Sequence, residues 1–321
     1  MGQIIKIYDY ISRYEQNIYN YPARFISLKR KQWELLKNNW ENGYFFSIQQ
    51  ENDDEFFAGY EQEAVKSRLR RLKDFIRRKY KSDDLESPGQ LFHQEKEKLP
   101  ESITELKSYF LDEIFQVQLS WASSTLQQKS YIDASFLREW QLKFFAQRFP
   151  DTYLFLYKPV LEIKKARIEA ETILITPSEL LCLRFLEDEE DSVYIGLEDR
   201  FWELRAYQRR KKIINPTLTL NRTEKIVKSI LHVYEIDFPI TKVLIAKDGF
   251  IDYPSAPYGL EIIDKRNFAE WFQKLRSYRS PLKPDHLKVA AAPLSLCRTQ
   301  AASRTNGPQC LACSTMHISH E

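Results

Sequence analysis

A block of apolar residues from Tyr153 to Leu186 constrains the fold of this 321-residue chain more than any other stretch. Its three runs of Ile, Leu, Val and aromatic residues are separated by Lys164-Lys165 and by Thr176-Pro177-Ser178-Glu179. Runs of this length with turn residues between them are typical of adjacent strands, because a helix would need ~10 residues or more. The third run, residues 180–185, is apolar on both faces apart from Arg184, which predicts a central strand covered on both sides.

Two charged residues stand out in this apolar block. Glu171 lies near the start of one expected strand, and Arg184 lies near the end of the next. An unpaired charge in a covered strand costs free energy, so we predict that Glu171 and Arg184 form an ion pair across adjacent strands. We also expect Arg184→Met to be tolerated better than Glu171→Leu, which would leave the cation without its partner.

The residues around Glu171 resemble the nuclease-related domain (NERD), a branch of the restriction-endonuclease-like superfamily. In that family one strand carries residues similar to IDHIVVTP, the next strand ends in Glu-x-Lys, and Asn-Pro opens a later helix. Here the corresponding stretch reads IEAETILITP, in which Glu171 takes the place of the Asp and Thr176-Pro177 matches. Asn215-Pro216 lies at a similar later position, and the resemblance extends over residues 133–265.

The resemblance implies nuclease chemistry, and the chain departs from the family at the residues that chemistry needs. Two acids hold Mg²⁺ and a Lys orients or activates the water. With the strands aligned without a gap, Arg184 replaces the second acid and Leu186 replaces the Lys. A cation at that position would repel a metal ion. Neither Glu187 nor Glu203 is a simple substitute, because a one-residue slip places Glu187 on the opposite strand face and Glu203 belongs to a later hairpin.

Glu139 is a further catalytic candidate, because a helix at this place carries an acid in NERD-like domains. The same residue also fits an ordinary exposed acid on a helix. We expect no cofactor, and Mg²⁺ only if the chain is an active nuclease.

Two basic clusters are candidate nucleic-acid-binding surfaces. The first lies on an expected helix at about residues 57–80. Between residues 66 and 81, Asp74 is the only acid among nine cations: Lys66, Arg68, Arg70, Arg71, Lys73, Arg77, Arg78, Lys79 and Lys81. The second comprises Arg209, Arg210, Lys211 and Lys212. Such clusters bind the phosphates of DNA or RNA, and they also occur as plain solvated faces balanced by acids elsewhere. Because the net charge is only +3, any such surface is a local patch.

Composition excludes several other classes of site. The chain has only eight glycines and none of them cluster, which removes Walker-type and dinucleotide-type phosphate loops. His93 and His232 are the only histidines before residue 280, which leaves almost no histidines for a hydrolase triad or a histidine-rich metal site. We expect a cytoplasmic protein without a membrane segment, because no run approaches ~20 apolar residues and a single cysteine lies in the patterned part.

The expected fold is α+β or α/β, with an N-terminal helical module followed by a mixed β-sheet domain flanked by helices. The module spans residues 1–81 and opens with two helices over residues 3–42, the first marked by Ile4, Ile7 and Ile11. A linker spans residues 82–101, and the NERD-like domain spans residues 102–279. Residues 280–321 contain no aromatic residue and are expected to be a disordered tail. Its Cys310-x-x-Cys313, His317 and His320 are spaced too closely for a zinc finger.

These observations together predict a catalytically degenerate NERD-like protein that binds nucleic acid or a protein partner. The alternatives are an active Mg²⁺-dependent nuclease and a protein-interaction scaffold with no nucleic-acid role.

Overall fold

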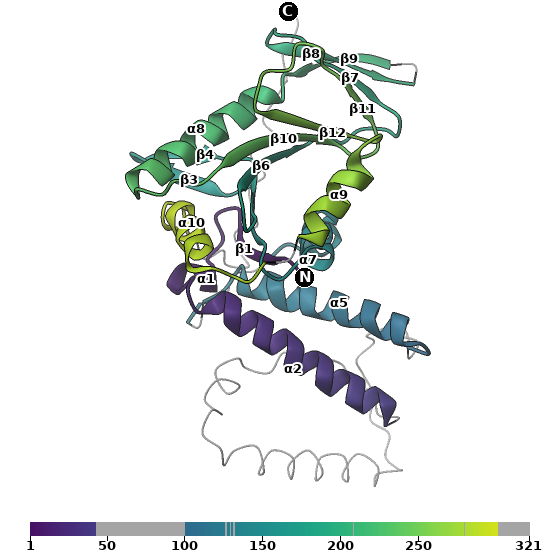
Figure 1. Cartoon of the computed structure of the whole chain (residues 1–321), viewed down its shortest axis with the longest axis vertical. Helices are drawn as coiled ribbons and strands as arrows, with labels where there is room; N and C mark the ends of the chain where they lie inside the picture. Colours follow the sequence, from purple (N-terminus) through teal and green to yellow (C-terminus); the bar gives the residue numbers. More distant parts are fainter. Residues whose placement is uncertain are drawn as a thin grey trace, which may run out of the picture. The chain divides into compact units, whose positions relative to one another are not determined.

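The computed structural model of the chain describes residues 1–42, 100–125, 127, 128, 130, 132–207, 209–278 and 280–300. They belong to two compact units, of which the first comprises Met1–Arg30 with Ile114–Glu321 and the second comprises Lys31–Glu113. The first unit combines helices with mixed sheets and has an α+β fold (Figure 1).

A six-stranded sheet forms the centre of the first unit. Its order is β1 (Gln3–Ile7), β2 (Leu154–Tyr157), β5 (Thr172–Ile175), β6 (Leu180–Phe185), β10 (Ile240–Ala246) and β12 (Leu260–Asp264). Strand β5 runs antiparallel to both of its neighbours, and all other neighbouring strands are parallel. This arrangement confirms the predicted mixed sheet.

Helices cover both faces of this large sheet. Residues Leu174, Leu181 and Val243 face a core that includes α7 (Trp140–Arg148) and α9 (Phe268–Ser277). The alternate residues of the same strands face α8 (Thr217–Val233), and α10 (Pro284–Ser295) lies on that same side (Figure 1). Burial on both faces explains why residues 173–175 of β5 and the first four residues of β6 are continuously apolar.

The apolar block of residues 153–186 contains more strands than its three runs predict. Lys158 and Pro159 divide the first run into β2 and β3 (Val160–Ile163), and residues 170 and 171 divide the second into β4 (Ala166–Glu169) and β5. Strands β3 and β4 form a separate hairpin, with Lys164 and Lys165 at its two-residue turn. Both lysines have positive φ, as such a turn requires.

A small four-stranded sheet lies at the top of Figure 1. Its order is β11 (Phe250–Asp252), β7 (Val193–Ile195), β8 (Phe201–Ala206) and β9 (Arg209–Ile214). The later hairpin that contains Glu203 is therefore the centre of a larger sheet. The second basic cluster, for which no structure was predicted, forms most of its edge strand β9.

The helix expected at the N-terminus is wrong for residues 3–7. These residues form β1, which pairs in parallel with β2, and all five are buried. Their helical spacing is coincidental, because β-branched Ile at positions 4, 5 and 7 also suits a strand buried on both faces. A short helix α1 (Arg13–Gln16) follows, and the second expected helix is α2 (Tyr21–Glu41). The predicted N-terminal module of residues 1–81 therefore contributes its first 30 residues to the unit that holds the sheets.

The structure has two helices where one was expected around Glu139. Helix α6 (Ser135–Arg138) ends where Glu139 is extended, and α7 begins at the next residue.

The prediction of disorder after residue 280 is wrong for the stretch that forms α10. Aliphatic residues replace the missing aromatic ones there, and Val289, Ala290 and Ala292 are almost fully buried. Beyond the helix, Gln300 bridges Tyr10 and Cys297 bridges Leu161. The Cys310, Cys313, His317 and His320 of the predicted tail lie outside the described residues.

The described part of the second unit consists of the end of α2 and the start of α5 (Ile103–Trp121). The rings of Trp33 and Phe110 lie 5.2 Å apart, and the Trp40 indole donates to the Pro100 carbonyl at 2.8 Å. Ser102 caps α5, because its hydroxyl accepts from the Glu105 N–H at 3.2 Å. The predicted linker of residues 82–101 lies almost entirely outside the described residues.

In the described part of the chain, no helix is both long enough and apolar enough to cross a membrane.

Candidate functional site

Glu171 and Arg184 form the predicted ion pair. They lie directly opposite each other at the adjoining ends of β5 and β6, because Thr172 pairs with Leu183. One Arg184 guanidinium nitrogen donates to both carboxylate oxygens of Glu171, at 3.1 and 3.3 Å. The two side chains differ in burial, since that of Glu171 is 8% exposed and that of Arg184 is 41% exposed. The pair thus joins a buried carboxylate to a cation that reaches solvent.

Helix α8 sets the environment of this pair. The backbone N–H of Glu171 donates to the Thr223 hydroxyl at 3.0 Å. Asn215 holds the start of the helix, where its side chain accepts from the Thr217 N–H at 2.9 Å and donates to the Asp199 carbonyl at 3.0 Å. The Asn-Pro sequence therefore serves a local purpose at the helix N-terminus, independent of any ligand.

A second ion pair lies on the same face of the sheet. Lys242 on β10 contacts Glu224 on α8 at 3.0 Å, and Lys242 is paired in register with Cys182. Burial is the main cause that raises the pKa of the Cys182 thiol to about 12, which leaves it protonated and unreactive at neutral pH. The face of the large sheet that α8 covers therefore contains charges that are paired with opposite charges, and a thiol that does not react.

The residues around Glu171 do not fit a Mg²⁺ site. Such a site needs several hard oxygen ligands, and the neighbour of Glu171 across the strands is a cation. Over the described residues, no group of three or more His, Cys, Asp or Glu has a geometry that could hold a metal ion. Leu186, at the position of the family Lys, offers no polar atom.

Glu139 lies on the other face of the large sheet, away from Glu171. Its carboxylate is close enough to the hydroxyl of Tyr157, which belongs to the core on the α7 side, to help raise the pKa of that hydroxyl, although burial is the main cause. Glu187 is on that side too, where it accepts from the Trp140 indole at 2.8 Å and from Gln141 at 2.5 Å. The structure therefore does not bring Glu139 or Glu187 together with Glu171. Glu203 is also separate, because it lies on β8 of the small sheet, where Arg205 donates to it at 2.8 Å.

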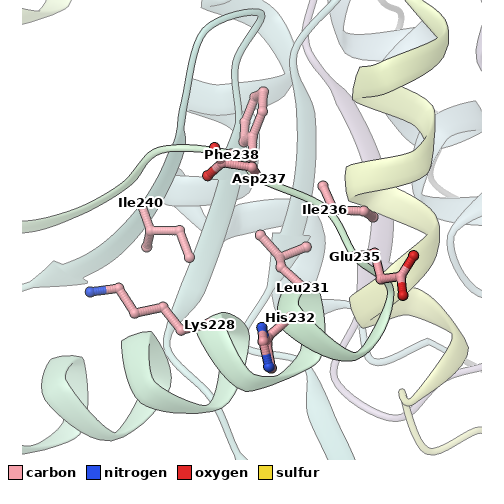
Figure 2. A pocket seen from close by; sticks show the side chains of 8 residues that line it. All are labelled: Lys228, Leu231, His232, Glu235, Ile236, Asp237, Phe238 and Ile240. Atoms are coloured by element: carbon pink, nitrogen blue, oxygen red, sulfur yellow. The ribbon is translucent and has the colours of Figure 1, made fainter.

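Two pockets lie near the ends of strands. One of about 230 Å³ is lined by residues 185–189 with Trp140, Tyr194 and residues 247–249, and its carboxylates face the single cation of Lys247. The other, of about 370 Å³, lies where α8 ends and the chain turns toward β10 (Figure 2). Its lining combines charges of both signs with apolar groups: Lys228, Leu231, His232, Glu235, Ile236, Asp237, Phe238 and Ile240. Both pockets contain acids and a lysine, but neither includes Glu171, and no group of three or more His, Cys, Asp or Glu among the described residues could hold a metal ion there.

The four cations of the second basic cluster are exposed along edge strand β9. Arg209 lies 3.5 Å from Glu189 and Arg210 lies 4.0 Å from Glu203, and both arginines are more than three-quarters exposed. Lys211 and Lys212 form no ion pair with any residue that the structure describes. Exposed pairs of this kind contribute little free energy, so these cations are available to an incoming polyanion. The other predicted cluster, from Lys66 to Lys81, lies outside the described residues.

Sequence reasoning missed the exposed apolar residues beside this strand. Phe201 on β8 lies directly opposite Ile214 on β9, and both are about half exposed. The signal was present in residues 201–206, FWELRA, where polar and apolar side chains alternate except that Phe occupies a position on the polar face.

Comparisons with known proteins do not show a family for this chain. No protein family model matches it, and no solved structure matches it. A 41-residue segment is 56% identical to part of an RNA 2',3'-cyclic phosphodiesterase from Geobacillus stearothermophilus. That segment is 13% of this chain and 13% of the relative, so the match covers about an eighth of either protein.

Proposed function

We propose that this protein is a non-catalytic NERD-like protein that binds nucleic acid through the exposed cations of β9. The observation that carries the proposal is the run of four consecutive cations, Arg209 to Lys212, on a solvent-exposed edge strand. Because successive residues of a strand point to opposite faces, these cations present charge on both sides of the edge. Phosphates of a nucleic-acid backbone can therefore approach from either side.

The Glu171–Arg184 pair supports the absence of nuclease catalysis in this proposal. The guanidinium occupies the space beside Glu171 in which a second carboxylate would complete a metal site. An active Mg²⁺-dependent nuclease would need carboxylates that lie elsewhere, on the opposite face or in the other sheet. The 41-residue match to an RNA phosphodiesterase is too short to argue for that activity, but it justifies RNA among the ligands to be tested.

Fluorescence anisotropy with labelled 20-nucleotide DNA and RNA, in single-stranded and duplex form, tests the proposal. Four phosphate contacts predict that affinity falls about 50- to 150-fold between 50 and 200 mM salt, because each contact releases condensed counterions. The double variant Lys211→Glu/Lys212→Glu is expected to lose most of this binding. Lys164→Glu/Lys165→Glu is the matched control, because it reverses two adjacent exposed lysines on another hairpin.

Three results would contradict the proposal. No binding of any nucleic acid at ~50 mM salt would favour a protein-interaction scaffold. Equal loss of binding in both double variants would mean that β9 is not the site. Cleavage of DNA or RNA on addition of Mg²⁺ or Mn²⁺ would show that the chain is an enzyme.

A further inference from the structure

The small sheet has two faces of opposite character. Its inner face carries the buried side chains of Tyr194, Trp202, Leu204 and Ile251. Its outer face, defined by the register of the four strands, consists of Phe250, Asp252, Val193, Ile195, Phe201, Glu203, Arg205, Arg210, Lys212 and Ile214. All ten are half-buried or exposed, so no described element covers this outer face.

On the outer face, the two aromatic rings lie on other strands than the cations of β9. Phe250 lies on β11 and Phe201 on β8, whereas Arg210 and Lys212 lie on the edge strand β9. One row across the sheet runs from Phe250 through Val193 and Arg205 to Arg210. From strand geometry the Cα atoms of the two phenylalanines lie roughly 16 Å apart, which is a span of a few nucleotides.

An arginine guanidinium lies over the ring of each of the two phenylalanines, Phe201 and Phe250. The Arg200 guanidinium carbon lies 5.8 Å from the centroid of Phe201, and that of Arg266 lies 5.9 Å from the centroid of Phe250. A guanidinium and an aromatic ring both stack on nucleobases, and each base has a π-face whatever its sequence. Phe201 is 46% exposed, which for a large apolar side chain is solvent contact that a stacked base would remove.

From this arrangement we infer that the outer face of the small sheet binds single-stranded nucleic acid, with bases stacked on Phe201 and Phe250. The backbone follows the cations of β9, and the carboxylates of Glu203 and Asp252 lie where they accept hydrogen bonds from exocyclic amino groups of bases. A duplex is excluded from the stacking, because its base faces are already stacked on one another. This inference rests on the proposed nucleic-acid function and adds the class of nucleic acid.

Anisotropy with one labelled 12-nucleotide pyrimidine strand, as DNA and as RNA, and with the duplex of each, tests the inference at 50 mM salt. The single strands are expected to bind at least about tenfold more tightly than the duplexes. Phe201→Ala/Phe250→Ala should weaken single-strand binding at least about tenfold, which is the loss of one to two stacked bases, and leave duplex binding within about twofold. Phe201→Tyr/Phe250→Tyr retains the rings and should bind as the original protein does. Tyr19→Ala is the matched control, because it removes a half-exposed aromatic ring that is not on the small sheet.

The outcomes separate this inference from the function on which it rests. If single strands and duplexes bind equally and the double alanine variant binds both normally, the stacking inference is overturned while nucleic-acid binding stands. If the original protein binds neither form, the proposed function itself fails. A thermal melt of each variant identifies a loss of fold. If the alanine variant binds weakly and the tyrosine variant binds normally, the loss of the aromatic rings explains the weaker binding.

Discussion

Glu171 and Arg184 form one ion pair, but they differ in how well water would solvate each charge if its partner were removed. Arg184 is 41% exposed, so water can solvate its guanidinium if the carboxylate is removed. Glu171 is 8% exposed, so its carboxylate would remain buried without a counter-charge if the arginine is removed. The burial of the pair therefore reverses the order of tolerance expected from the sequence, which took Arg184 to be the covered partner.

At the scale of single residues, Arg184→Met is predicted to destabilise the protein by about 2 kcal/mol and Glu171→Leu by about 1 kcal/mol. These values are below those of fully buried pairs, because solvent reaches Arg184. The double variant Arg184→Met/Glu171→Leu should be more stable than Arg184→Met alone, since it removes the stranded charge. Urea unfolding of the three variants measures this cycle. Equal destabilisation by the two single changes would show that the buried carboxylate finds another partner.

Asp264 connects several elements of the first unit through one buried carboxylate. It ends β12 and accepts from the backbone N–H of Ile251 on β11 at 3.3 Å and from that of Arg266 at 3.0 Å. The Arg266 side chain also donates to it, at 3.1 Å to either oxygen, and Asn267 at the start of α9 accepts from its N–H. The large sheet, the small sheet and α9 therefore meet at this residue.

At the scale of these elements, Asp264 should make stability depend on pH. Burial alone would raise the pKa of Asp264, but the hydrogen bonds from Arg266 and Ile251 outweigh it and lower the pKa below its ordinary value of 3.8. A carboxyl group whose pKa is lowered by folding stabilises the protein above pH 3.8, and this contribution is lost as pH falls through the lowered pKa.

Asp264→Asn is predicted to cost about 1–2 kcal/mol at pH 7, because an amide replaces an anion that accepts charged hydrogen bonds. The difference in unfolding free energy between the two proteins should be constant from pH 7 to 5 and shrink below pH 4. Urea titrations at pH 7, 5 and 3.5 measure it. A difference that stays the same at pH 3.5 would mean that Asp264 does not titrate with unfolding.

At the scale of the whole molecule, segments that precede and follow the predicted domain of residues 102–279 in the sequence complete the fold of the first unit. Strand β1 supplies an edge of the large sheet, and α10 lies against the same face as α8. Lys6 on β1 is fully buried, where it contacts the carboxylate of Glu15 and lies 3.5 Å from the Thr299 hydroxyl. Residues near positions 6 and 299 are therefore neighbours in the folded unit.

A fragment of residues 102–279, the domain expected from sequence, is predicted not to reach a native fold. It lacks β1, α1 and α10, and it would expose β2 along the edge that β1 covers. An uncovered apolar edge strand promotes aggregation. Near-ultraviolet circular dichroism and size-exclusion chromatography of this fragment, compared with residues 1–300, measure the effect. A monomeric fragment with native near-ultraviolet signal would show that the added segments are dispensable.

The sequence predicted the central strands and the ion pair because those residues carry strong local signals. Unbroken apolar runs between turn residues identify β2, β5 and β6. Two opposite charges in an otherwise apolar stretch are expected to form an ion pair. The errors at β1 and α10 have a common physical cause. Both segments are short and pack against elements that are distant in the sequence, β2 for β1 and α8 for α10, and local periodicity does not report such contacts.

The candidate binding surface was predictable in its charge but not in its shape. Arg209 to Lys212 are a plain basic run, yet nothing local shows that β9 is an edge strand or that Phe250 shares a face with Arg210. That row crosses four strands, and β11 is separated from the other three along the chain by α8 and β10. Only the register of the small sheet reveals which side chains point the same way.

The pairing of β1 with β2 has a consequence for the synthesis of the chain. Roughly 150 residues separate the two strands, and ribosomes add ~5–20 residues per second, so β1 leaves the ribosome on the order of 10 s before its partner exists. Throughout that interval Ile4, Ile5 and Ile7 have no sheet to join, and α10 is made later still. The yield of folded protein in a cell should therefore depend on translation speed and on chaperones that shield this strand, quantities that its equilibrium stability does not report.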